Sequence, residues 1–301
     1  MGKIPAVYEP VANRAALSFP LASVETLYGK VLLLGSFGDP SVDCRDPALG
    51  LFVSLAGGRR ARIVVLEQTS RDEQAEPSPL AAALRYLGAK RVDVVEVPVS
   101  CSGQLNLGSA IPHATGVLFV GDDPQILLAS LAGSVLLSTI RTRHHNGAVI
   151  AGIGAGAAIL GEEVLPRPFG AANDARGQAV ARKGNESKFP GLKFLPGWVV
   201  DSAYGGNRNL EGLLLSLAAN PALFGLGIEA GVGVLANSTG QVTSLGGGLA
   251  MVLDGREATS DYAERRIGEI VSISGSRLYM LGDGRRFDPR DGEVHSLLAG
   301  D

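Results

Sequence analysis

Short runs rich in apolar residues recur along the first half of the chain and predict strands. The runs are Lys30–Gly35, Arg62–Leu66, Val92–Val97, Gly116–Val120 and Ala148–Ala151. Lys30–Gly35 and Arg62–Leu66 lack the polar–apolar alternation of a strand with one solvated face, so these two are expected to be buried strands of a parallel sheet. The spacing of the runs, ~25–35 residues, leaves room for a helix between consecutive strands.

Helical patterns lie between these runs. Pro47–Ala56 and Leu80–Leu87 are expected to form helices, and Gly88 after the second is suited to a C-cap. Gln125–Arg141 is expected to form one amphipathic helix. The alternation predicts an α/β fold with a doubly wound, mostly parallel sheet, in which ligands bind at the carboxyl ends of the strands. The loops expected at that edge are Gly35–Asp39, Gln68–Arg71, Gly121–Gln125 and Gly152–Ala157.

The second half of the chain has a different pattern. Gly161–Phe189 is a polar stretch with Pro and Gly, which predicts a surface excursion. Asn209–Ala219 predicts a further helix. Glycine-rich turns at Gly246–Gly248 and Gly282–Asp288 predict antiparallel edge hairpins near the C-terminus.

Composition supports a globular protein and narrows its partners. Residues 29–301 show no repeat or linker and are expected to form a single domain, after an irregular N-terminal arm over residues 1–28. Hydrophobic residues make up 46% and charged residues 19%, and the net charge of -3 argues against a nucleic-acid partner. No segment resembles a signal peptide or a membrane span, so a cytoplasmic protein without a membrane partner is expected. Cys44 and Cys101 lack a metal-binding spacing, and neither a metal nor a cofactor is expected.

The segment Ala148–Ala158, AVIAGIGAGAA, has the layout of a nucleophile elbow. In such an elbow an apolar strand meets a helix through small residues, because the sharp turn has no room for larger ones. The tip residue is serine or cysteine in an active hydrolase, but here it is Gly154, which has no side chain. By itself, such a turn is also typical of tight packing or of anion binding by backbone N–H groups.

Seven segments together have the order and spacing of motifs in one known family. They are Val31–Gly35, Arg62–Ser70, Leu84–Val97, Gly116–Gln125, Gly147–Ala158, Gly191–Leu213 and Gly225–Gly231. Through them the chain resembles cyanophycinase and dipeptidase E, which are serine peptidases, from about Lys30 to about Leu253. The resemblance implies a glutamine-amidotransferase-like, cyanophycinase-like α/β fold and a dimer.

The resemblance also implies where a catalytic triad would lie. The family's serine corresponds to Gly154, its histidine to Ala203 and its glutamate to Ala230. The chain is therefore expected to be a degenerate member, or pseudoenzyme, without the nucleophile, base and orienting carboxylate. The glycine whose N–H helps to bind an oxyanion corresponds to Asp122, whose carboxylate would repel negative charge.

Acidic and polar residues near these positions are candidates for a remnant ligand pocket. An acidic cluster there would attract a cation or a basic ligand such as an arginine-containing peptide. Asp123 before Pro124 is, however, also the pattern of a helix N-cap followed by proline at the first helical position. The candidate pocket residues are Asp122, Asp123, Gly154, Ala155, Asp201, Ser202, Tyr204 and Glu229.

Ser202 and Cys101 are the alternative nucleophiles. Ser202 directly precedes the position of the family's histidine, and Cys101 follows a strand, but neither has a base nearby in the sequence. His113, His144 and His145 precede strands, which places them at the opposite edge of the sheet from the elbow.

These patterns favour a function without catalysis. We expect a binding or regulatory subunit for a peptide or amino-acid-derived ligand, as a homodimer or in a heteromer with an active homologue. The alternative is an active amide or peptide hydrolase or transferase that acts on an aspartyl or arginyl compound with relocated catalytic residues. A third interpretation is a family member without any retained role.

Overall fold

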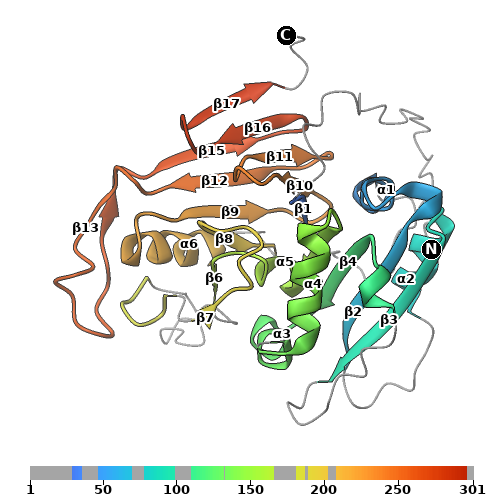
Figure 1. Ribbon diagram of the computed structural model, residues 1–301. Coiled ribbons are helices and arrows are strands. Elements are labelled where there is room, and N and C mark those ends of the chain that lie inside the picture. Colours follow the sequence, from blue (N-terminus) through green and yellow to red (C-terminus); the bar gives the residue numbers. More distant parts are fainter. Residues whose placement is uncertain are drawn as a thin grey trace, which may run out of the picture.

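The computed structural model describes most of the chain that follows the expected N-terminal arm (Figure 1). The predicted arm, Cys44 and Cys101 lie outside the described residues, as does most of the expected surface excursion. The described ranges are 29–35, 47–69, 78–98, 110–131, 133–165, 181–186, 189–202 and 208–296.

A nine-stranded sheet forms the centre of the fold. The five strands that come first in the chain, β1 to β5, run parallel to one another in this sheet. Their spatial order is β1 (Val31–Leu34), β5 (Val149–Gly154), β4 (Gly116–Gly121), β2 (Arg62–Thr69) and β3 (Arg91–Pro98). Antiparallel strands continue the sheet beyond β1, in the order β10 (Gly233–Ala236), β11 (Val242–Leu245), β16 (Arg285–Asp288) and β17 (Glu293–Ser296).

Helices cover both faces of the parallel strands, which confirms the predicted doubly wound α/β fold. On one face α1 (Pro47–Leu55) and α2 (Pro79–Tyr86) bury apolar side chains against the sheet. On the other face lie α3 (Pro124–Leu131), α4 (Val135–His145) and the short α5 (Ala155–Ala158). Short 3₁₀ helices η2 (Gly58–Arg60) and η3 (Ile111–His113) precede β2 and β4.

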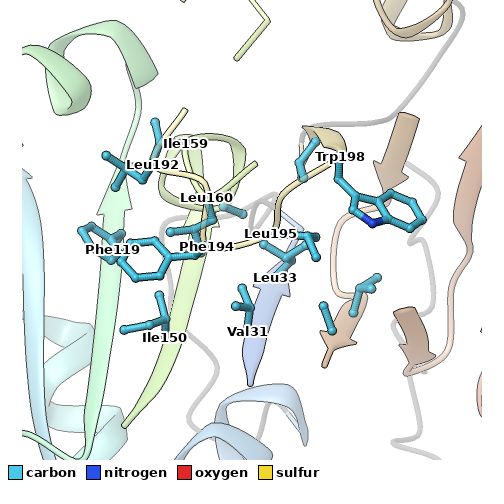
Figure 2. Close-up of a cluster of buried hydrophobic side chains, with 14 of the residues drawn as sticks. Val31, Leu33, Phe119, Ile150, Ile159, Leu160, Leu192, Phe194, Leu195 and Trp198 are labelled. Atoms are coloured by element: carbon cyan, nitrogen blue, oxygen red, sulfur yellow. The ribbon is translucent and has the colours of Figure 1, made fainter. Parts of the chain in front are cut away.

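The core on the second face is well packed around two phenylalanines. Phe119 of β4 and Phe194 have ring centroids 6.3 Å apart, and both are at most 8% exposed. Figure 2 shows Ile150 of β5 next to these rings, and Val31 and Leu33 of β1 farther along the same cluster. A central strand is covered by such side chains on both faces and has no contact with water. This burial explains why its sequence is apolar at successive positions.

A second sheet of six strands was not predicted from the sequence. Its order is β15 (Arg277–Leu281), β12 (Ala250–Asp254), β9 (Phe224–Ile228), β8 (Trp198–Asp201), β6 (Glu163–Val164) and β7 (Phe189–Pro190). Helix α6 (Arg208–Ala219) packs Leu213 and Leu217 against it. A small ribbon of β13 (Thr259–Ser260) and β14 (Ile273–Ser274) lies beyond (Figure 1).

Aromatic side chains join the two sheets. Trp198 of β8 stacks on Phe224 of β9 with ring centroids 5.0 Å apart. Phe287 of β16, in the nine-stranded sheet, meets both rings edge-on at 6.1 and 5.7 Å. Edge-to-face contacts of this kind add to the burial of apolar area, so they help to fix the second sheet against the first.

Two predictions about connections were wrong. The expected single helix Gln125–Arg141 is two helices, because Gly133 has φ +69° and Ser134 caps α4 by accepting from the backbone N–H of Leu137. The predicted antiparallel edge hairpins near the C-terminus are present as β10–β11 and β16–β17, but the turns at Gly246 and Gly282 do not close them. Instead they connect strands of different sheets, β11 to β12 and β15 to β16.

The lengths and hydrophobicity of the helices decide whether any of them could span a membrane. Among the described residues, no single helix is long and apolar enough to cross a membrane. Helices α3 and α4 reach the required length and composition only as a pair bent by 94°.

Candidate functional site

Gly154 forms a sharp turn between β5 and α5 at the carboxyl edge of the parallel sheet. Its φ of 57° and ψ of -124° lie in a region that residues with a side chain rarely adopt. A strained strand-to-helix turn of this kind is what exposes the nucleophile of a hydrolase elbow. A Cβ atom at Gly154 would have one close neighbour, the carbonyl oxygen of Gly121 at 3.4 Å, so there is space for a side chain here.

Two flanking glycines are required for a different reason, which is the close approach of backbone to backbone. A Cβ at Gly152 would lie 2.3 Å from the carbonyl oxygen of Gly156. A Cβ at Gly156 would lie 2.0 Å from the carbonyl oxygen of Phe119. These contacts hold α5 directly against β4 and β5, and they fix the position of the Gly154 turn between them.

Asp123 belongs to the neighbouring turn and caps helix α3. Its Oδ1 accepts from the backbone N–H groups of Gln125 at 2.8 Å and Ile126 at 3.2 Å. Pro124 follows as the first residue of the helix. The capping prediction is therefore confirmed, and the main partners of this carboxylate are backbone N–H groups of its own helix.

Gln68, at the end of β2, provides a contact that the sequence did not reveal. Its side-chain oxygen accepts from the backbone N–H groups of Asp122 at 3.3 Å and Asp123 at 3.2 Å. Two backbone N–H groups that converge on one oxygen are the arrangement of an oxyanion hole. Here that oxygen comes from the protein's own carboxamide, which lies against Gly121, the β4 residue paired with Gly154.

Ser202 lies beside the elbow and is buried. It follows β8, and its hydroxyl donates a short hydrogen bond to the carbonyl oxygen of Gly154. Only 3% of the residue is exposed. Asp201, the preceding residue, ends β8 in register with Gly227 of β9. Ser202 is thus in direct contact with the Gly154 turn, and its hydroxyl proton is directed at a backbone carbonyl.

Glu229 follows β9, and its side chain reaches the residue that precedes β12. Its Oε2 accepts from the backbone N–H of Leu249 at 2.9 Å. The backbone of Glu229 and Ala230 packs so closely on Gly35 that a Cβ there would lie 1.9 Å from the Glu229 carbonyl oxygen. Ala230 itself is exposed at this edge.

Three further positions named from the sequence are Ala155, Ala203 and Tyr204. Ala155, the first residue of α5, is 3% exposed. Ala203 and Tyr204 lie outside the described residues.

In the part of the chain that the structure describes, there is no group of three or more His, Cys, Asp or Glu side chains that could hold a metal ion. The described candidates all lie at the carboxyl ends of their strands: Asp122 and Asp123 after β4, Gly154 and Ala155 at β5, Asp201 and Ser202 at β8, and Glu229 after β9.

Comparison with known proteins decides the family of this chain. The model of peptidase family S51 matches residues 32–240, which is more than half of the chain. The chain belongs to peptidase family S51. Membership in S51 confirms the cyanophycinase and dipeptidase E resemblance at the level of the family.

Individual S51 relatives are distant in sequence. The cyanophycinase of Synechococcus elongatus is 28% identical over 249 residues, which cover 82% of this chain and 75% of that protein. The cyanophycinase of Trichormus variabilis is 26% identical over 278 residues, covering 90% and 89%. The crystal structure of a peptidase from an acI-B1 Actinobacterium matches with a TM-score of 0.59 and 16% identity, over 87% of this chain and 97% of that one. At this identity the structural match shows the shared fold.

Proposed function

We propose that this S51 family member is a non-catalytic binding or regulatory subunit for a peptide or amino-acid-derived ligand. One observation carries the proposal: the elbow has no attacking side chain, and the N–H pair beside it is already bonded to Gln68. In an active hydrolase both groups have to be available, because the nucleophile attacks the carbonyl and the N–H groups stabilise the resulting oxyanion.

The other triad positions support the same proposal. By family resemblance the base position is Ala203 and the orienting position is Ala230, and neither side chain can move a proton. His144 and His145 end α4 ahead of β5, at the sheet edge opposite the elbow. A histidine base from that edge is therefore not within reach of Gly154.

The expected ligand follows from the edge residues and from the relatives. Asp122 places an exposed carboxylate beside the elbow, where it would attract a guanidinium or ammonium group. The curated relatives are cyanophycinases, so aspartyl-arginine fragments of cyanophycin are the first ligands to test. We further propose that the chain acts in the cytoplasm as a homodimer or with an active S51 relative.

Calorimetry and an activity assay together test this function. β-Aspartyl-arginine is expected to bind the full chain, and binding is expected to weaken on Asp122→Asn but not on Glu96→Gln, a change at an exposed position on β3. The same dipeptide is expected to remain uncleaved. Cleavage of the dipeptide, or a complete lack of binding by any aspartyl or arginyl dipeptide, would contradict the proposal.

Relocated chemistry is the second candidate, and the buried contact of Ser202 with Gly154 is the observation in its favour. A hydroxyl at this place would be close to a substrate carbonyl bound at the edge. If Ser202 acted as nucleophile, Ser202→Ala would abolish turnover and labelling by a fluorophosphonate. We expect neither turnover nor labelling in the unmodified chain.

A further inference from the structure

A cavity lies at the edge of the main sheet opposite the elbow. Where α4 ends and β1 begins, the structure has a cavity of about 740 Å³. Its lining includes Arg141 and His144 from α4, Lys193 and Phe194 from the segment before β8, and Gly29 before β1. Because Gly154 is at the other end of β5, this cavity is separate from the elbow.

Arg141 and Lys193 bring positive charge to the cavity. The Arg141 guanidinium lies 5.0 Å from the centre of the Phe194 ring, and one of its nitrogens donates to the carbonyl oxygen of Leu192 at 2.5 Å. A guanidinium has five N–H donors, so this bond leaves others for a ligand. The Lys193 ammonium pairs with Glu162 at 2.6 Å and also has further protons to donate.

His144 contributes a neutral ring to the same cavity. Its Nδ1 lies 3.1 Å from the carbonyl oxygen of Ala148, which can only accept, so this nitrogen carries a proton. Burial lowers the pKa of His144, and the positive charge of Arg141 acts in the same direction. The ring is also edge-on to Phe194 at 5.3 Å. The cavity therefore combines a neutral, partly aromatic wall with two cations.

Lys193 has a backbone conformation that is unfavourable for a residue with a side chain. Among the described residues it is the one non-glycine residue with a positive φ, at 54°. Backbone hydrogen bonds from Leu192 to Ile159 and from Lys193 to Gly161 hold it there. Strained residues of this kind persist where the surroundings determine them, and they are concentrated at ligand sites. Glycine would be the unstrained choice, and the lysine present instead carries an ammonium group that pairs with Glu162 and lines the cavity.

We propose that this cavity binds a small organic monocarboxylate, with Arg141 and Lys193 on the carboxylate and Phe194 beside the apolar part. A planar guanidinium matches the geometry of a carboxylate. A doubly charged phosphate fits less well, because the C-terminal end of α4 carries partial negative charge and Glu162 is close to Lys193. The end of the helix alone explains basic residues on α4, but not Lys193, which comes from another segment.

Calorimetry of the full chain with benzoate at pH 7 tests this proposal, with benzamide as its neutral isostere and inorganic phosphate as a competing anion. We expect benzoate to bind, benzamide not to bind, and phosphate to bind more weakly than benzoate. Arg141→Gln combined with Lys193→Gly is expected to weaken benzoate binding by about tenfold or more. Arg91→Gln, which breaks an exposed ion pair with Asp93 on β3, is the control and should leave binding unchanged.

Folding of the variants is checked by thermal unfolding. Lys193→Gly suits the positive φ, so this single variant is expected to fold and to lose benzoate affinity even if Arg141→Gln does not fold. Absence of benzoate binding, equal binding by the folded variants, or tighter binding of benzamide or phosphate would overturn the proposal. None of these results depends on the function proposed for the elbow.

Discussion

The side-chain oxygen of Gln68 lies 3.3 Å from the backbone nitrogen of Asp122, in the turn between β4 and α3. A second bond, from the N–H of Asp123 at 3.2 Å, completes the same arrangement. The Gln68 carboxamide therefore occupies both N–H groups, of which that of Asp122 corresponds, by the proposed family correspondence, to a donor for an oxyanion. Substitutions of Gln68 and of the elbow residues can test the importance of these contacts.

Removal of the Gln68 carboxamide should expose the N–H pair of Asp122 and Asp123. We expect Gln68→Ala to lower the free energy of unfolding by about 1 kcal/mol, because two hydrogen bonds of a half-buried group pass to water. We also expect tighter binding of a ligand with a carbonyl oxygen, such as β-aspartyl-arginine. Urea unfolding and calorimetry measure the two effects, and Glu96→Ala on β3 is the control. Unchanged or weaker dipeptide binding by folded Gln68→Ala would show that the carboxamide does not compete with the ligand.

Substitutions at the elbow glycines should distinguish two causes of instability, which are backbone strain at Gly154 and steric clash at Gly152. Gly154→Ala has room for its Cβ but an unfavourable φ, so a loss of about 1–3 kcal/mol in the free energy of unfolding is expected. Gly152→Ala places its Cβ 2.3 Å from a backbone oxygen, and a larger loss is expected because the backbone has to move. Equal losses in urea unfolding would argue against this account of the turn.

The cap on α3 can be tested in the same way. Asp123→Ala should lower the free energy of unfolding by about 1 kcal/mol, because Gln125 and Ile126 lose their acceptor. Asp123→Asn keeps a capping oxygen and should retain most of the stability. If Asp123→Ala instead left stability unchanged and abolished ligand binding, the carboxylate would be a binding group and not chiefly a cap.

Acid should destabilise the fold partly through Asp288. Hydrogen bonds from Arg290 hold the pKa of this buried carboxyl well below its usual range, and the Gln241 amide adds to the effect. A carboxyl whose pKa is lower in the folded state stabilises the fold above its unfolded pKa, and that contribution is lost as the pH falls. Urea unfolding between about pH 5 and pH 3 should therefore show a shallower decline in Asp288→Asn than in the unmodified chain. Asp93→Asn, at a surface ion pair, is the control. Identical slopes would refute the role of Asp288.

The parallel half of the fold was predictable because short runs rich in apolar residues alternate with helical patterns. The five predicted strands all form, and α1 and α2 lie where apolar periodicity placed them. The break between α3 and α4 depends on Gly133 and Ser134, whose signal is weak inside an otherwise helical pattern. The second sheet was missed because its strands are short and its aromatic contacts join residues far apart in the chain.

The candidate site was predictable in position but not in detail. The elbow glycines are adjacent in the sequence, so the turn at Gly154 could be recognised from its motif. The Gln68 contact joins residues 54 positions apart and depends on one side-chain conformation, which no local pattern records. The direction of the Ser202 hydroxyl toward Gly154 is likewise a property of the folded chain.

The most direct test of the central claim is to follow β-aspartyl-arginine with the purified full chain, measuring hydrolysis and binding heat in one set of conditions. We predict binding without cleavage, both in the unmodified chain and in Ser202→Ala. Cleavage that disappears in a folded Ser202→Ala variant would contradict the account and would establish relocated catalysis at the elbow.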